Sequence, residues 1–253
     1  CFSDINNNNF ANLAVTKFIR EKIEKTVKNK SKAKILSNFN HPFGAKRPAL
    51  DIKYFETFNK ENVKLIDLKK HKIRTADKYG IWVDQEYHPM DILIFATGFD
   101  AITGSILKIK VIGRKKVNLK NEWSKNIFSL LGLQIPGFPN LFTITGPGSP
   151  SVLTNMPRAI EQHVDWITNC IKYLRENGKN YIEANKKAAI AWDKEVKKAA
   201  EKGMFLKTSN SWYLGTNIKG KPSGFIPYSG GLNHYRKICN DIAYNDYRGF
   251  SLR

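Results

Sequence analysis

One segment constrains the fold more than any other: a short apolar run that enters a glycine- and proline-rich turn and continues as a long amphipathic stretch. Residues 141–145 read Leu-Phe-Thr-Ile-Thr and lead directly into Gly146-Pro-Gly-Ser-Pro150. From there to about residue 177, apolar side chains recur at helical spacing. We therefore predict a buried strand, a tight turn and a helix, an order typical of α/β domains, in which the helix N-terminus offers backbone N–H groups. An ordinary connection between a strand and a helix would look the same.

A second apolar run predicts another buried strand. Residues 90–97 are almost continuously apolar after Asp91, and the run ends at Thr97-Gly98. Such runs are typical of strands covered on both faces in a parallel or mixed sheet. Gly98 lacks the Cβ that would keep a ligand away from the backbone, so Thr97 and Gly98 are candidate binding residues. A tight turn after a core strand is an equally good explanation.

The remaining elements are expected to alternate between helices and irregular structure. Spacing of apolar residues predicts helices over 10–28, 31–36, 54–59 and 184–202. A strand is predicted at 63–67, and a hairpin is predicted around the polar turn between 81–83 and 87–88. Residues 107–142 are interpreted as irregular strands and loops. The tail, 212–253, is interpreted as loop-rich because it contains many glycine, proline and aromatic residues.

Charge and cysteine content narrow the class of protein. The net charge is +20 and the pI is about 9.8, which admits nucleic-acid binding. The lysines are dispersed and mixed with glutamate, however, so we interpret them as solvated helix faces and expect no nucleic-acid partner. The apolar runs are too short to span a membrane, and no secretory signal is visible. Three distant cysteines without a CxxC pair predict no metal site, no disulfide framework and a reducing, cytoplasmic location.

Two further motifs carry candidate site residues. Gly44-Ala-Lys46-Arg47 places two cations on a loop, where a guanidinium could hold an anion and an ammonium could meet a phosphate. Ser211-Trp212-Tyr213 begins a glycine-rich segment, where an aromatic face could lie over a nucleotide ribose. A solvated basic pair and a packed surface loop are the corresponding structural explanations.

Taken together and in this order, the motifs resemble those of the type I Baeyer–Villiger monooxygenases, the group of cyclohexanone and phenylacetone monooxygenases. Ala96-Thr-Gly-Phe99 resembles the segment that lies between the NADP and FAD domains of such flavoproteins. The resemblance runs from near the first residue to the last. Its closest stretches are 41–47, 54–59, 96–104, 138–156, 160–164 and 211–236.

The resemblance implies an α/β fold, namely the C-terminal part of a flavoprotein with Rossmann-like FAD and NADP domains. Residues 1–42 would end a helical insertion in the NADP domain, 43–98 would complete that domain, and 99–253 would belong to the FAD domain. The implied reaction uses NADPH, FAD and O2 to convert a ketone into an ester or lactone through a flavin C4a-peroxide.

The resemblance also implies roles for individual residues. Arg47 matches the catalytic arginine, Lys46 matches the contact to the NADP 2′-phosphate, and Trp212 matches the tryptophan that touches NADP. Other positions match the segments beside the cofactors, and two of them would face the substrate. The cofactor-side positions are Thr97, Gly98, Gly146, Pro147, Asn155 and Met156, and the substrate-facing positions are Leu153 and Met156.

The family's first glycine-rich FAD motif, its FxGxxxHxxxW signature and its glycine-rich NADP motif do not occur in this sequence. We therefore expect a fragment of a longer enzyme that is inactive and holds FAD and NADPH incompletely by itself. One alternative is a flavin monooxygenase that oxidises nitrogen or sulfur, which should lack the Gly-Ala-Lys-Arg and Ser-Trp-Tyr motifs. The other is a non-catalytic basic protein that binds nucleic acid.

Overall fold

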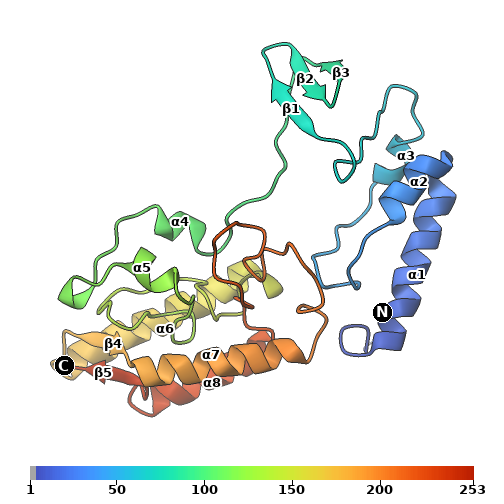
Figure 1. Ribbon diagram of the computed structural model, residues 1–253. Coiled ribbons are helices and arrows are strands. Elements are labelled where there is room, and N and C mark those ends of the chain that lie inside the picture. The colour runs from blue at the N-terminus through green and yellow to red at the C-terminus, as the bar shows by residue number, and fades with distance from the viewer. Residues whose placement is uncertain (1–3) are drawn as a thin grey trace. The chain divides into compact units, whose positions relative to one another are not determined.

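The computed structural model describes residues 4–253, and its contacts divide the chain into two compact units (Figure 1). The first unit contains the described residues up to Phe43 together with Arg47–Gly98, and the second contains Gly44–Lys46 and Phe99–Arg253. Helices dominate both units, and each unit carries one small antiparallel sheet.

Helices and a hairpin form the first unit. Helix α1 spans Asn9–Thr26, α2 spans Lys30–Ser37 and the short α3 spans Tyr54–Thr57. Asparagine side chains cap both longer helices, because Asn8 and Asn29 accept backbone N–H groups of their first turns. A small apolar cluster holds the three helices together. These helices confirm the predictions made for residues 10–28, 31–36 and 54–59.

The sheet of the first unit is a three-stranded meander. Strand β2 (Gly80–Val83) pairs antiparallel with β1 (Ile73–Ala76) on one side and β3 (Glu86–Pro89) on the other. The predicted hairpin is therefore confirmed, while β1 was not predicted, because Ile73-Arg-Thr-Ala76 lacks a clear alternation of apolar residues. The strand predicted at residues 63–67 is wrong: that segment has no ladder partner and remains irregular.

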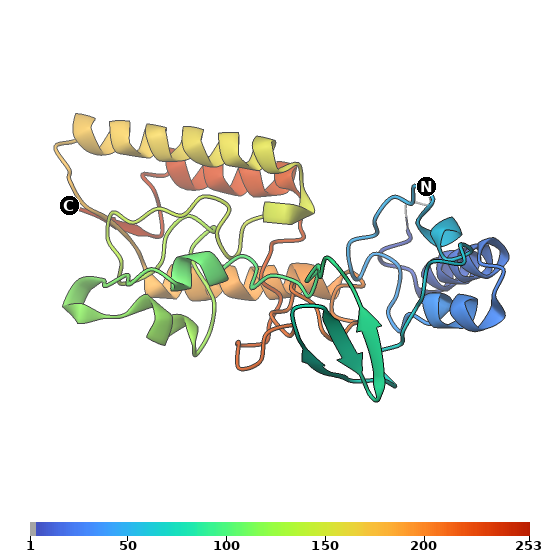
Figure 2. The ribbon, with the colours of Figure 1, turned by 90° about the horizontal axis from the view of Figure 1, so that it is seen from above.

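Three long helices build the second unit: α6 (Met156–Glu176), α7 (Lys186–Glu201) and α8 (Leu232–Tyr244). Helices α6 and α8 pack against each other, as both ribbon views show (Figure 2). The antiparallel pair β4 (Ile182–Ala184) and β5 (Phe250–Leu252) lies beside them. The shorter elements are α4 (Gly104–Leu107), η1 (Arg114–Lys116), α5 (Leu119–Trp123) and η2 (Ser151–Leu153).

The predictions for α6 and α7 are confirmed, but α8 was missed. Glycine, proline and aromatic residues upstream made the whole tail look like loop, yet a helix begins directly after Gly231. Strands β4 and β5, each of three residues, are too short to leave a periodic signal.

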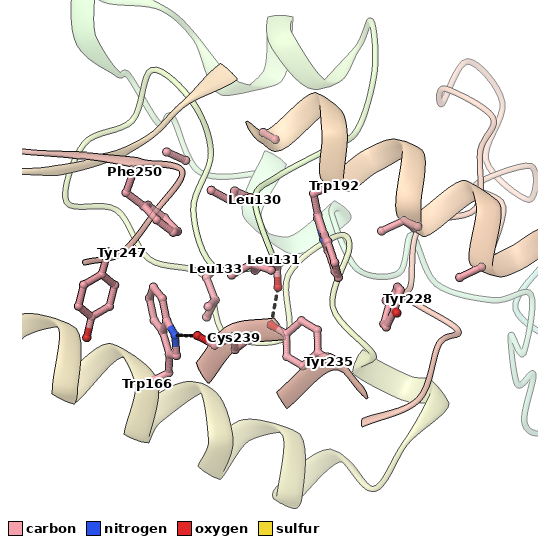
Figure 3. Packing of buried hydrophobic residues seen from close by; sticks show 14 of the residues in the cluster. Leu130, Leu131, Leu133, Trp166, Trp192, Tyr228, Tyr235, Cys239, Tyr247 and Phe250 are labelled. Atoms are coloured by element: carbon pink, nitrogen blue, oxygen red, sulfur yellow. Dashed lines mark hydrogen bonds between the residues drawn. The ribbon is translucent and has the colours of Figure 1, made fainter. Parts of the chain in front are cut away.

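Large aromatic side chains fill the core between α6, α7 and α8 (Figure 3). Trp166, Trp192 and Tyr235 are at most 6% exposed, and their rings contact those of neighbouring aromatic residues. The indole N–H of Trp166 donates to the carbonyl of Cys239 over 3.0 Å, so even the polar edge of this side chain is satisfied. Burial of this kind fixes the three helices relative to each other.

Both predicted buried strands are wrong. Residues 90–97 are extended and exposed, with Ile94 81% and Phe95 77% accessible to solvent. A strand requires a hydrogen-bonded neighbour, and beyond the Met90 N–H, which donates to the Tyr79 carbonyl, the described residues place none beside this run. In residues 141–145 only Phe142 makes a ladder contact, an isolated bridge to Gln134. The apolar runs were identified correctly, but pairing with other segments decides whether they become strands.

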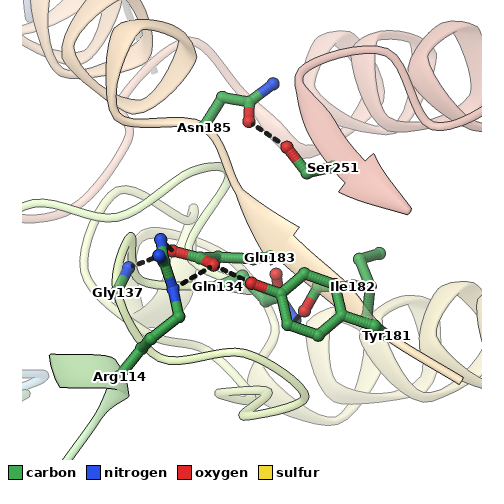
Figure 4. A network of polar contacts seen from close by, with 8 residues as sticks. All are labelled: Arg114, Gln134, Gly137, Tyr181, Ile182, Glu183, Asn185 and Ser251. Carbon is green, nitrogen blue, oxygen red and sulfur yellow. Dashed lines mark hydrogen bonds and ion pairs between the residues drawn. The ribbon is translucent and has the colours of Figure 1, made fainter. Parts of the chain in front are cut away.

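The Glu183 side chain on β4 holds the irregular segment that contains Arg114 and Gly137 (Figure 4). Its carboxylate accepts two hydrogen bonds from the Arg114 guanidinium, at 3.1 and 3.0 Å, one from the Gly137 backbone N–H at 2.9 Å, and one from the Tyr181 hydroxyl. Burial raises the pKa of this carboxyl, but Arg114, Tyr181 and the Gly137 N–H outweigh it and hold the pKa below its usual value. Four separate contacts thus depend on one ionised side chain.

We predict that Glu183→Ala lowers the free energy of unfolding by roughly 2–3 kcal/mol, because it leaves several donors without their acceptor. Glu183→Gln should cost less, since the amide oxygen keeps part of the network. Urea unfolding followed by tryptophan fluorescence measures both values. Equal stability of wild type and Glu183→Ala would contradict an anchoring role.

Candidate functional site

A cavity of about 450 Å³ in the second unit gathers several of the residues singled out from the sequence. Four parts of the chain form its walls: the start of the second unit at residues 101–106, Trp123, the stretch 142–156, and the loop that carries Trp212. The cavity brings together Gly146, Pro147, Met156 and Trp212. Its size falls within the usual range of small-molecule sites.

Three cavities have larger volumes but contain none of the site residues predicted from the sequence. One of about 690 Å³ in the first unit is lined by both charged and apolar side chains, and one of about 630 Å³ lies between α7 and α8. The third, of about 580 Å³, lies around Arg114 and Glu183. We therefore take the 450 Å³ cavity as the candidate site.

Two predicted residues of the same stretch do not line the cavity. Leu153 packs against the main hydrophobic core. The Asn155 side chain caps α6, where its Oδ1 accepts the backbone N–H of Arg158 over 3.2 Å. Helix capping is a sufficient structural reason for an asparagine at this position.

The other predicted residues lie where the chain passes between the two units. Thr97 and Gly98 are exposed at the end of the first unit, and Gly98 adopts a φ of 98°. No described atom lies within 4 Å of the place where a Cβ would stand on Gly98, so backbone conformation explains this glycine better than close approach does. Lys46 is half-buried in the second unit, whereas Arg47 is exposed and belongs to the first.

The glycine-rich turn uses its own backbone N–H groups internally. Gly146 donates to the Gly132 carbonyl, Gly148 to the Ile226 carbonyl and Ser149 to the Gly146 carbonyl, over 3.2, 2.8 and 3.1 Å. The turn therefore offers none of these three groups as a free donor to a ligand. These bonds fix the shape of the turn, because two of them tie it to neighbouring segments and the third closes it on itself.

The N-terminus of α6 provides the polar feature that the turn does not. Met156 is the first residue of this 21-residue helix, and its side chain lines the cavity. A helix of this length carries a partial positive charge at its N-terminus, which favours negative charge in front of it. The remaining walls are mostly apolar or aromatic, so this helix end supplies the electrostatic polarity of the cavity.

Backbone strain concentrates in the cavity wall. Ile102 and Thr145 both line it, and both adopt left-handed conformations, with φ values of 66° and 52°. They are the only β-branched residues with positive φ in the part of the chain that the structure describes. Such a conformation costs on the order of 1–3 kcal/mol and persists only where the surroundings impose it, as happens often at functional sites.

A buried histidine holds one of these strained residues. The backbone N–H of Thr145 donates to Nδ1 of His163 on α6 over 2.9 Å, and Nε2 of His163 lies 2.8 Å from the Tyr235 hydroxyl. Burial lowers the pKa of His163 to about 4. His163 is therefore neutral near pH 7, which leaves Nδ1 able to accept the bond from Thr145.

The loop that carries Trp212 is tied to the opposite wall. Lys221 has only 6% of its side chain exposed, and its Nζ lies 2.6 Å from Oδ1 of Asp100 and 2.9 Å from the carbonyl of Ala101. Asn217 adds a bond to the Phe99 carbonyl over 3.1 Å. These contacts hold the loop that carries Trp212 to the segment that begins the second unit.

The sequence analysis missed three residues at the site: Ile102, Trp123 and His163. A left-handed isoleucine leaves no sequence signal, because β-branched residues rarely adopt this conformation. Trp123 lies in a segment that was interpreted as irregular, although it lines the cavity from the short helix α5. Only His163 offered a clue, since one polar residue interrupts the buried face of α6.

Among residues 4–253, no helix is long and apolar enough to cross a membrane. Nor do those residues contain a group of three or more histidine, cysteine, aspartate or glutamate side chains that could hold a metal ion.

We predict that His163 makes the stability of the second unit depend on pH between about 6.5 and 4. The folded chain keeps His163 neutral down to about pH 4, whereas the unfolded chain binds a proton below about 6.5. The stabilising contribution is complete above pH 6.5 and declines as the pH falls, by up to roughly 3 kcal/mol. The measurement is the difference in unfolding free energy between wild type and His163→Asn at several pH values. A difference that does not change over this window would show that His163 titrates normally.

Several curated monooxygenases are similar to this chain over its whole length. It is 35% identical to the 2-oxo-Δ3-4,5,5-trimethylcyclopentenylacetyl-CoA monooxygenase of Pseudomonas putida and 35% identical to the cyclohexanone 1,2-monooxygenase of Acinetobacter sp. It is 36% identical to the phenazine N-monooxygenase of Lysobacter antibioticus. Each comparison covers 99–100% of this chain and 46% of the relative, so the chain spans just under half the length of these relatives. No family model matches the chain.

Solved structures give the same result. The closed crystal structure of cyclohexanone monooxygenase matches with a TM-score of 0.94 and 35% identity, over 100% of this chain and 47% of that one. The OTEMO complex with FAD and NADP matches with a TM-score of 0.93 and 33% identity, over 100% and 46%. Together with the relatives, these matches confirm the predicted fold class and the resemblance. The chain therefore belongs to the Baeyer–Villiger monooxygenase family and corresponds to the C-terminal portion of these two-dinucleotide-domain flavoproteins.

Proposed function

We propose that this chain is part of a flavin-dependent monooxygenase that inserts one oxygen atom of O2 next to a ketone carbonyl, giving an ester or lactone, with NADPH as reductant. One observation carries the proposal: Gly146, Pro147, Met156 and Trp212, four residues selected from the sequence for this chemistry, line one cavity. The names of the relatives support the same reaction class, since they include cyclohexanone and cyclopentanone monooxygenases.

The cavity fits the flavin ring of FAD. Its walls combine aromatic and aliphatic side chains, which suit a flat ring system, with the positive end of α6, which suits an electron-rich edge. FAD as a whole is larger than this cavity, so these residues would hold the ring and not the complete cofactor. When bound, FAD would transfer electrons from NADPH and activate O2.

We assign distinct roles to the cations at the passage between the units. Arg47 would stabilise negative charge that develops on oxygen during the reaction, because a guanidinium stays protonated and spans two oxygen atoms. Lys46 would meet the 2′-phosphate of NADP as a point charge. The exposed position of Arg47 leaves its side chain accessible to a ligand.

The remaining assignments follow the cavity. Gly146 and Pro147 would lie against the flavin, and Met156 would face both flavin and substrate. Thr97 and Gly98, at the end of the first unit, would contact cofactor, and Asn155 would act by capping α6, which begins at the site. Leu153 would shape the substrate side from within the core, which its packing supports.

We also propose a domain assignment and a location. Residues 1–42 would belong to an insertion in the NADP domain, 43–98 to the NADP domain and 99–253 to the FAD domain. The division of contacts at Gly98 supports the last boundary.

A cytoplasmic location is supported by Cys170 and Cys239, two buried thiols without a disulfide partner.

N-oxygenation is the second candidate function. The phenazine N-monooxygenase is as similar to this chain as the ketone-oxidising relatives are. Product analysis of the full-length enzyme that contains this chain separates the two functions. With NADPH, it should convert a cyclic ketone into a lactone and should form no N-oxide from an aromatic N-heterocycle.

We predict that Trp212→Ala, in the full-length enzyme that contains this chain, raises the KM for NADPH about tenfold or more and leaves FAD content unchanged. Trp212 lines the cavity, and its truncation removes both an aromatic face and an N–H donor. Trp212→Phe is the matched control, because it keeps an aromatic face. Steady-state kinetics and the ratio of flavin to protein absorbance provide the readouts. Equal losses of NADPH and FAD binding would indicate a packing role.

The sharpest prediction concerns Arg47. Removing one preorganised donor to developing negative charge costs on the order of 3–4 kcal/mol, or about a hundred- to a thousandfold in rate. Arg47→Ala should therefore abolish detectable ester formation while the protein remains folded and keeps FAD. Arg47→Lys should recover only part of the rate, because an ammonium cannot span two oxygens.

Product formation from cyclohexanone with NADPH tests this prediction beside a melting curve. Lys53→Ala is the control, since it removes another exposed cation of the same unit. An ester yield from Arg47→Ala close to wild type would remove Arg47 from the reaction.

A further inference from the structure

A chain of buried hydrogen bonds connects the cavity wall to the core. The Thr145 N–H donates to Nδ1 of His163 over 2.9 Å, Nε2 of His163 lies 2.8 Å from the Tyr235 hydroxyl, and that hydroxyl donates to the Leu131 carbonyl over 2.5 Å. His163 and Tyr235 are both 0% exposed. Water cannot replace any partner in this chain without entering the core.

The direction of each bond follows from its ends. A carbonyl can only accept, so the Leu131 oxygen takes the single proton of the Tyr235 hydroxyl. The Tyr235 oxygen must then accept from Nε2 of His163, which makes His163 the Nε2–H tautomer. Nδ1 consequently carries a lone pair and accepts the N–H of Thr145. Tyr235 thus selects the tautomer that binds Thr145.

The first and last residues of this series of hydrogen bonds, Thr145 and Leu131, lie on strained turns that contact each other. Leu131 and Thr145 adopt φ values of 61° and 52°, and each precedes a glycine. The two turns are joined directly, since Gly146 donates to the Gly132 carbonyl. Ser129 joins them again: its Oγ accepts the Gly132 N–H over 2.8 Å and donates to the Pro147 carbonyl over 2.6 Å.

These direct bonds fix the turns relative to each other, but only His163 ties Thr145 to a long helix. Its ring reaches from α6, which also begins at the cavity with Met156. The same helix therefore sets two parts of the wall, one through its first residue and one through His163. Any change in the His163 bond alters the position of Thr145 relative to Met156.

We propose that His163 is a positioning residue, selected in its Nε2–H tautomer by Tyr235, that holds the Thr145–Gly146 turn in the shape required to receive the flavin ring. The inference rests on the proposed function, because it takes flavin as the ligand of the cavity. A purely structural histidine would contribute to stability without controlling the turn.

Three variants separate these roles. His163→Asn keeps an acceptor near the position of Nδ1 and loses the contact to Tyr235. His163→Leu removes both bonds. Trp166→Phe is the matched control: it lies on the same helix and removes one buried hydrogen bond to α8, the one to the Cys239 carbonyl, without touching either turn.

Amide hydrogen exchange of Thr145, measured by NMR on the 253-residue chain, tests the bond without any cofactor. His163→Leu should accelerate exchange at Thr145 about tenfold or more, because the N–H loses its acceptor. His163→Asn should restore most of the protection, and Trp166→Phe should leave Thr145 unchanged. Equal exchange in wild type and His163→Leu, or equal loss in Trp166→Phe, would overturn the proposal.

Titration of FAD into the full-length apoenzyme tests the connection to the ligand. His163→Leu should weaken FAD binding about tenfold and shift the visible flavin band, while His163→Asn recovers much of the affinity and Trp166→Phe matches wild type. Identical affinity and spectrum in His163→Leu and wild type would overturn the positioning role. Absence of FAD binding in wild type itself would instead reject the proposed function, and the exchange result would still decide whether His163 controls the turn.

Discussion

The packing of α6 against the aromatic core is the interaction on which the rest of the second unit depends. Trp166 faces α8 and His163 lies nearly one turn before it, so one helix face carries both the core contact and the bond to Thr145. Because α6 is held along its length by buried side chains, its N-terminus at Met156 has a fixed position. The cavity is built at that end.

The position of α6 explains why a largely apolar cavity can still have a positive electrostatic potential at one end. The glycine-rich turn uses its donors to hold its own shape, as Gly146 and Gly148 show. The dipole of α6 then supplies positive potential without a charged side chain in the wall. A flavin ring, flat and electron-rich at one edge, matches both properties, whereas the dispersed positive charge of the chain has no part in the geometry of the cavity.

Local periodicity predicted the helices well and the strands poorly, for a physical reason. A helix satisfies its hydrogen bonds within one segment, so the helical spacing of apolar residues up to about residue 177 was sufficient to predict α6. A strand depends on a neighbour, so the apolar run at residues 90–97 could not reveal that no described segment pairs with it. The helix α8 was missed because the glycines before it dominate the composition of the tail.

The candidate site was predictable where chemistry is carried by residue type, and unpredictable where it is carried by conformation. Trp212 and Met156 were found from motifs and lie in one cavity. Ile102 and Thr145 contribute through left-handed backbone, which only the folded structure reveals. His163 acts through a backbone N–H distant in sequence, so its partner could not be inferred from its neighbours.

An experimental structure of the full-length enzyme with FAD bound is the most direct test that this cavity holds the flavin ring. We expect the flavin ring to lie against Pro147 and Met156, with its electron-rich edge toward the N-terminus of α6 and the His163–Thr145 bond intact. A flavin ring bound elsewhere, with this cavity filled by protein side chains or solvent, would contradict it.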